Sequence, residues 1–122
     1  MNATIRKIFH NDQKERNLVR MGLLTLNELA KKDKTRESKV NKIFKKQKKL
    51  TGEDLFYIAL IFHHRGTIIA LKKAKSFAEA SFSLGYKKSK KLLKLIEDRS
   101  LIKQGKRQRY NTQKPLVLKK KK

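Results

Sequence analysis

Residues 51–62, with the sequence TGEDLFYIALIF, decide the fold of this 122-residue chain. Thr51 is a good N-cap residue, and Glu53 and Asp54 place negative charge in the first turn, where a helix dipole favours it. The run Leu55 to Phe62 that follows is apolar on nearly every side of a helix, so the helix must be buried all round. A buried strand is the alternative for this run, but no neighbouring strand candidate could pair with it. We therefore predict the central helix of a helical protein.

Two helices are predicted before it. Asn11 or Asp12 can cap the first, with Glu15 placed to complete a capping box. Apolar residues then recur at three- and four-residue steps, as on one buried helical stripe: Leu18, Val19, Leu23, Leu26 and Leu29. Residues 31–39 are interpreted as a charged connection. Ser38 then caps a short helix whose inward residues are Val40, Ile43 and Phe44.

Two more helices are predicted after it, separated from it by Gly66 and Thr67. The first carries a narrow stripe of small and apolar residues that lets another helix pack closely: Ala70, Ala74, Phe77, Ala78, Ser81 and Phe82. Gly85 suits the left-handed position at its end. The second has its own helical period before Gly105: Leu92, Leu93, Leu95, Ile96, Leu101 and Ile102.

These elements predict an all-α fold, a small bundle of four to five helices whose pairs pack as in tetratricopeptide or Sel1-like hairpins. We expect a basic N-terminal arm at 1–10, the helical domain at 11–113 and an extended lysine-rich tail at 114–122. Low hydrophobicity with high net charge also typifies disordered chains. Here the apolar residues fall in patterned blocks, so disorder is expected only after Pro115.

Charge is the strongest functional signal in the sequence. Lys and Arg number 34 against 10 acidic residues, a formal net charge of +24. Such self-repulsion indicates a polyanionic partner, and nucleic acid suits this much charge better than an anionic membrane or an acidic protein. We expect RNA, with ribosomal RNA first, because a compact helical body with a basic tail is the build of ribosomal proteins. Ribosomal proteins are then further partners, and non-specific DNA binding is an alternative.

Several other classes are disfavoured. Without cysteine there is no disulfide, thiol nucleophile or zinc ribbon. The N-terminus lacks the apolar region of a signal peptide, and the longest apolar run is too short to span a bilayer. We therefore expect an intracellular protein, of the cytoplasm or an organellar matrix, that needs no cofactor.

Basic residues near helix ends and loops are the candidate phosphate ligands. Arg107, Arg109 and Tyr110 stand out, because Arg planes and a Tyr ring can stack on unpaired bases. The full predicted nucleic-acid-binding set is Lys45, Lys46, Lys48, Lys49, Lys87, Lys88, Lys90, Lys91, Lys103, Lys106, Arg107, Arg109, Tyr110, Lys119, Lys120, Lys121 and Lys122.

Four polar clusters differ from the lysine background. They occupy residues 12–16 (DQKER), 62–66 (FHHRG), 97–99 (EDR) and 105–113 (GKRQRYNTQ). In this order they resemble an uncharacterised bacterial helical family, a domain of unknown function. Its members read D-Q-x-x-R, then a Q-H-G that follows an apolar helix, then E-D-R and G-x-x-Q-x-Y-G-T-Q. The resemblance spans residues 11–113.

That resemblance implies a helical fold and a set of site residues, but no activity. The set is Asp12, Gln13, Arg16, His63, His64, Asp98, Arg99, Gln108, Tyr110 and Gln113. The chain departs from the pattern at residues 63–66, where His-His-Arg-Gly stands for Gln-His-Gly. It also departs at Asn111, which replaces a glycine but tolerates a left-handed backbone. The high charge is a further departure.

A catalytic interpretation remains as the runner-up. His64 follows the buried helix and could approach Asp98 and Arg99 from a facing helix, a workable acid–base site for phosphodiester cleavage by a metal-independent ribonuclease or toxin. A structural ion pair is the simpler interpretation of Glu-Asp-Arg. The adjacent His63 and His64 point about 100° apart on a helix, so no metal site is predicted.

Overall fold

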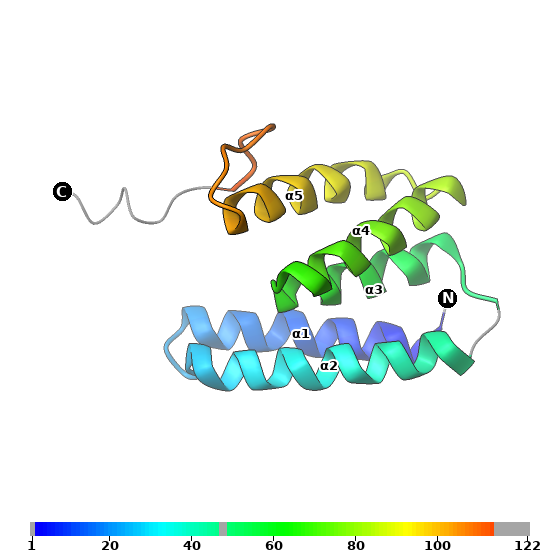
Figure 1. The fold of residues 1–122 in the computed structure, drawn as a ribbon. Helices are drawn as coiled ribbons and strands as arrows, with labels where there is room; N and C mark the ends of the chain where they lie inside the picture. The colour runs from blue at the N-terminus through cyan, green and yellow to red at the C-terminus, as the bar shows by residue number, and fades with distance from the viewer. Residues whose placement is uncertain (1, 47–48, 114–122) are drawn as a thin grey trace.

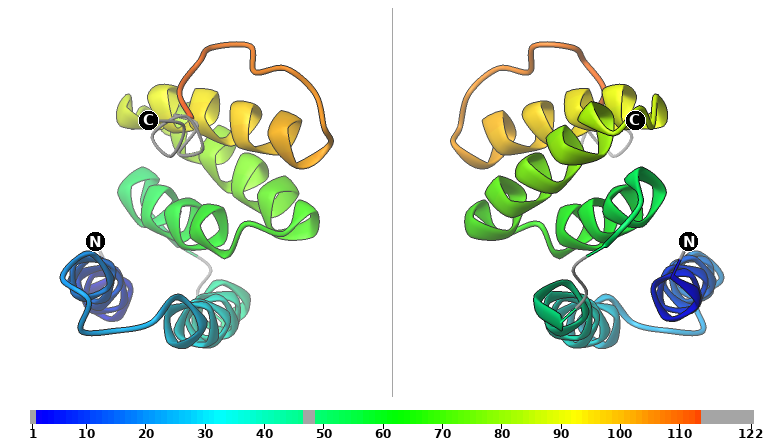
Figure 2. Two further views of the ribbon diagram at one scale, coloured as in Figure 1. Left: turned by 90° about the vertical axis from the view of Figure 1, so that its left-hand side faces the viewer. Right: turned by 90° about the vertical axis from the view of Figure 1, so that its right-hand side faces the viewer.

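The computed structural model describes residues 2–46 and 49–113. In these residues the fold is all-α, as predicted, and consists of α1 (Ala3–Arg20), α2 (Leu26–Lys46), α3 (Gly52–Arg65), α4 (Ile68–Ser83) and α5 (Lys88–Lys103). Helices α1 and α2 form an antiparallel pair, with α3, α4 and α5 stacked on it in that order (Figures 1 and 2). Helix α3 contacts all four other helices. None of the described helices is long and apolar enough to cross a membrane.

Helix α3 begins as the sequence predicts. The Thr51 hydroxyl accepts a hydrogen bond from the Asp54 amide, and the Asp54 carboxylate accepts one from the Thr51 amide, each 3.0 Å long. The other Asp54 oxygen accepts from the Asn2 amide at 2.7 Å, which ties the start of α1 to the start of α3. The helix ends at Gly66 with φ +76°, a left-handed conformation that favours glycine.

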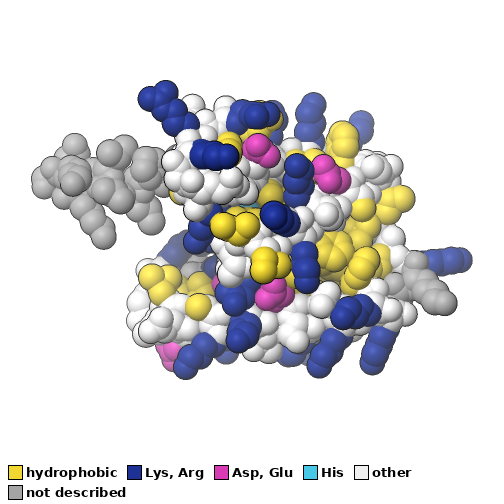
Figure 3. Space-filling model, in the orientation of Figure 1, with side chains coloured by type: hydrophobic (Ala, Val, Ile, Leu, Met, Phe, Trp, Pro, Cys, Tyr) yellow, Lys and Arg dark blue, Asp and Glu magenta, His cyan; other side chains and the backbone are white. Residues whose placement is uncertain are grey.

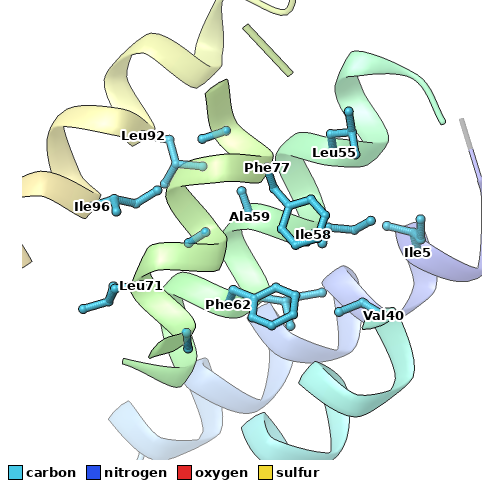
Figure 4. Close-up of a cluster of buried hydrophobic side chains, with 14 of the residues drawn as sticks. Ile5, Val40, Leu55, Ile58, Ala59, Phe62, Leu71, Phe77, Leu92 and Ile96 are labelled. Carbon is cyan, nitrogen blue, oxygen red and sulfur yellow. The ribbon is translucent and has the colours of Figure 1, made fainter. Parts of the chain in front are cut away.

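The core is built around α3. Ile58, Ala59 and Phe62 are completely buried (Figure 4). They pack with apolar residues of every other helix, among them Ile5, Val40, Leu71, Leu92 and Ile96. The small residues of α4 are buried as predicted. Ser81 on α4 donates to the Gly52 carbonyl at 2.5 Å and accepts from Ser89 of α5 at 2.7 Å, so three helices meet at that side chain.

Helix α1 differs from the prediction. It begins at Ala3 with Asn2 as N-cap, not at Asn11 or Asp12, so residues 3–10 are helical rather than an arm. The reason is that Ile5 and Ile8 belong to the core. Glu15 therefore has no capping role. The predicted stripe also breaks after Arg20, and Leu23 and Leu26 are exposed.

Helix α2 differs more. Residues 31–39 are not a connection, because one helix runs from Leu26 to Lys46 without a new start at Ser38. Thr25 and Glu28 form the capping box that begins it. Polar residues of the supposed connection face inward, where they pair with charges on other helices. At the edges, Phe44, Phe82 and Ile102 are more exposed than their stripes predicted.

Candidate nucleic-acid interface and ion network

The outer face of α5 carries a basic groove. Lys87, Lys90, Lys91 and Lys94 follow one another at helical spacing, and with Tyr110 and Thr112 they line an open hollow of about 620 Å³, the lysine groove. No acidic side chain is among the residues that line it. The groove therefore gathers Lys87, Lys90, Lys91 and Tyr110 of the predicted binding set, together with Lys94.

Tyr110 reaches the groove because residues 105–113, the C-terminal loop, fold back over α5 (Figure 2). The anchor is Asp98, whose buried carboxylate accepts hydrogen bonds from the amides of Arg109, Tyr110 and Thr112 at 2.8–2.9 Å. The Thr112 hydroxyl donates a fourth at 2.7 Å. One carboxylate thus fixes the backbone on both sides of Asn111.

The loop is closed by a second, reciprocal pair. The Gln108 side chain donates to the Gln113 carbonyl and accepts from the Gln113 amide, at 2.7 and 2.8 Å. Asn111 has φ +56°, so it adopts the left-handed backbone predicted for it. The Glu-Asp-Arg and Gln-x-Tyr-x-Thr-Gln clusters are therefore one structural unit.

Hydrogen bonding dominates the ionisation of Asp98. Burial alone would raise its pKa, but the bonds from Thr112, Tyr110 and Arg109 hold the pKa at about 2. A carboxyl group with a depressed pKa stabilises the fold above its unfolded value, and that contribution is lost as the pH falls through about 2. The loop is thus held in place throughout the neutral range.

The other predicted phosphate ligands are dispersed. Lys88 lines an adjoining apolar groove, and Lys103, Lys106 and Arg107 are exposed at the end of α5 and in the loop. Lys45, Lys46 and Lys49 lie where α2 ends, at the end of the molecule away from the loop (Figure 1). Basic side chains are scattered widely over the face in Figure 3, with few acidic ones among them. Lys48 and the tail residues Lys119, Lys120, Lys121 and Lys122 lie outside the described residues.

A second polar feature, the ion network, lies between α1, α2 and α3. It consists of Asp12, Glu15, Arg16, Asp33, Arg36 and His64. Asp12 is fully buried and its carboxylate lies 2.6 Å from His64 Nδ1, 3.1 Å from Arg16 Nε and 3.4 Å from Arg36 Nη2. Asp33 accepts from Arg16 at 2.9 and 3.0 Å and from Arg36 at 2.8 Å, and Arg36 also pairs with Glu15.

Ionisation in the network follows from this pairing. Burial would raise the pKa of Asp12, but the contacts with His64, Arg16 and Arg36 lower it below its usual value. Burial likewise opposes the charge on Arg36, yet its bonds to Asp33 and Glu15 raise its pKa. The two arginines are thus charged and matched by buried carboxylates, an arrangement that stabilises the junction of α1 and α2 only while it is complete.

The predicted grouping of His64 with Asp98 is wrong. Asp98 is engaged with the loop, and the carboxylate that meets His64 is Asp12 from the first cluster, to which Gln13 also donates at 3.2 Å. Arg99 does not approach a carboxylate either, since its Nη1 donates to the His63 carbonyl at 2.6 Å. Gly66 makes room for that guanidinium, because a Cβ there would lie 2.5 Å from Arg99 Nη2.

His63 is buried beside these cations. Desolvation first, and then the charges of Arg99, His64 and Arg16, lower its pKa to about 3. His63 is therefore neutral at physiological pH. Among the described residues no cluster of acidic and histidine side chains could hold a metal ion.

The sequence interpretation missed Glu15, Asp33 and Arg36 as network members. A signal for two of them was present, since Leu29, Asp33, Arg36 and Val40 follow one another at steps of four, three and four. That period places the two charged residues on the buried face of one helix.

Comparisons with known proteins leave the chain without a relative: no family model, no curated protein and no solved structure matches it. The resemblance to the uncharacterised bacterial helical family stays a prediction.

Proposed function

We propose that the protein binds RNA, with ribosomal RNA as its partner, through lysines that neutralise phosphates. The observation that carries the proposal is the lysine groove, where four lysines and an exposed tyrosine gather with no carboxylate among the lining residues. Lysines at such a site act as point charges that need no fixed geometry to meet a phosphate.

The distribution of acidic side chains supports the same conclusion. Asp12, Glu15 and Asp33 are used inside the ion network, and Glu37 pairs with Arg65. Few carboxylates therefore remain to compensate the surface lysines. The resulting positive potential attracts a polyanion and accelerates its association.

A salt series tests the proposal on a structured ribosomal RNA fragment. A protein that neutralises several phosphates loses affinity steeply with salt, by about 0.7–0.9 in the log–log slope for each contact. Replacing Lys87, Lys90, Lys91 and Lys94 by Gln should therefore reduce the slope by about 3. The matched control replaces Lys7, Lys14, Lys31 and Lys34, four exposed lysines on α1 and α2, and should change it less.

An affinity that barely changes between low and physiological salt would refute phosphate neutralisation. The ribosomal assignment has its own test, which is sedimentation of the native protein in a gradient. We expect it to travel with ribosomal particles and to leave them at high salt. A protein that stays at the top of the gradient at low salt would contradict that assignment.

One observation favours a second candidate, an RNA-cleaving enzyme. His64 is held through Nδ1 by the buried Asp12, and its side chain remains 18% exposed, so an oriented imidazole faces outward. A histidine oriented by a carboxylate is a competent acid–base group. Labelled RNA incubated with wild-type protein and His64→Ala decides the matter. Cleavage that the substitution abolishes supports the enzyme, and cleavage that persists or never occurs removes it.

A further inference from the structure

Tyr110 is unlike the other tyrosines of the protein. Tyr57 and Tyr86 are half-buried and pack on Phe9 and Phe56 at centroid distances of 4.4 and 5.0 Å. Tyr110 is 43% exposed, and its ring neighbour is the ammonium group of Lys94, 5.5 Å from the centroid. The ring is therefore available to a ligand, and its position is not explained by core packing.

The position is nevertheless fixed. Asp98 accepts from the Tyr110 amide at 2.9 Å, and the bonds on either side of it hold the rest of the loop. An aromatic ring presented in this way loses little conformational freedom on binding, so most of its contact energy contributes to affinity. The loop holds the ring ready for a planar partner.

The charges around the ring select the side that an anionic partner uses. A second hollow, of about 280 Å³, also includes Tyr110, but Glu79 and Glu97 line it. The lysine groove offers Tyr110 together with lysines and Thr112 alone. A polyanion is therefore favoured in the lysine groove and opposed in the second hollow.

We propose that the lysine groove takes a single-stranded RNA segment, with one unpaired base stacked on Tyr110 and the flanking phosphates on Lys87, Lys90, Lys91 and Lys94. The inference rests on the proposed RNA binding and narrows it. Bases inside a duplex are stacked on each other and present no free face to a side chain, whereas an unpaired base does.

The test measures binding of a labelled single-stranded oligonucleotide, the same sequence in a duplex, and inorganic polyphosphate as a polyanion without bases. The variants are Tyr110→Ala, Tyr110→Phe and Phe82→Ala. Phe82, 44% exposed at the end of α4, controls for the loss of an exposed ring. Tyr110→Ala should weaken single-strand binding by about five- to one-hundred-fold, the range for losing one stacked base. Tyr110→Phe and Phe82→Ala should bind as the wild type does.

Polyphosphate binding separates the two proposals. We expect Tyr110→Ala to leave it unchanged, while the four-lysine variant loses it. If Tyr110→Ala binds the single strand like wild type while the lysine variant does not, RNA binding stands and base stacking is refuted. If Tyr110→Ala weakens polyphosphate and single-strand binding equally, the ring only holds the loop, and stacking is again refuted. If the lysine variant binds every probe as tightly as wild type, the proposed site itself fails.

Discussion

The ion network and the lysine groove hold charged side chains in opposite ways. In the network, Asp12, Asp33 and Arg36 are buried, and each cation meets a carboxylate within 4 Å. In the groove, four lysines stand side by side on one helix face without an acidic neighbour in the lining. The first arrangement satisfies its charges within the chain, and the second leaves them for a partner.

The difference shows what the acidic residues do. Among the 10 acidic residues, most bind an internal cation or a backbone amide: Asp12, Glu15, Glu28, Asp33, Glu37, Asp54 and Asp98. The carboxylates therefore hold helices, caps and the loop together. The net charge of +24 follows because the lysines have no comparable internal role.

The largest effect is expected from breaking the network at its centre. Asp12→Asn removes the charge that Arg16, Arg36 and His64 share, and it leaves buried cations uncompensated. We expect the free energy of unfolding to fall by about 3–5 kcal/mol, as for other broken buried ion pairs. Urea denaturation measures it. Glu79→Gln, at an exposed acid on α4, is the control, and equal small effects of the two would contradict a structural network.

Two glycines separate the strain of a left-handed backbone from the room that Arg99 needs. Gly22 and Gly66 both have φ +76°, but only at Gly66 would a Cβ meet the Arg99 guanidinium. Gly22→Ala should cost about 1–2 kcal/mol. Gly66→Ala should cost about 1.5–3 kcal/mol more, because Arg99 must give up its bond to the His63 carbonyl. Equal losses in denaturation would show that Arg99 contributes nothing there.

His63 should make the protein sensitive to mild acid. Its pKa is lowered from 6.5 to about 3 in the fold, so the unfolded chain binds the proton more tightly. The stability from neutral His63 is complete above pH 6.5 and is lost as the pH falls toward 3, by about 2 kcal/mol at pH 5. His63→Gln should remove that part of the pH dependence between 7 and 5. His10→Gln, at an exposed imidazole, is the control, and a parallel curve for His63→Gln would refute the assignment.

The smallest effect on stability is expected in the groove. Replacing Lys87, Lys90, Lys91 and Lys94 by Gln should change the free energy of unfolding by no more than about 0.5 kcal/mol per site, because no internal partner is lost. Thermal denaturation checks this without RNA. A large destabilisation would mean that these lysines hold the fold together, which would remove the contrast between the two regions.

The second half of the fold was predictable from the sequence because its signals are local. Thr51, Gly66 and Gly85 mark helix ends through backbone chemistry, and the apolar residues between them repeat at helical spacing. The first half misled because its buried face is partly charged. Asp33 and Arg36 look like surface residues until their partners on α1 are known, so a buried helix face was interpreted as a connection.

The candidate site divides in the same way. Composition alone determined that the chain carries a large excess of lysine, and local motifs determined that residues 97–99 and 105–113 are special. Only the tertiary structure decided which residues meet. It gave His64 to Asp12 rather than Asp98, and it gave Asp98 to the loop that presents Tyr110. The physical reason is that a hydrogen bond or ion pair depends on distance in space, and these partners are separated by 52 and 12 residues along the chain.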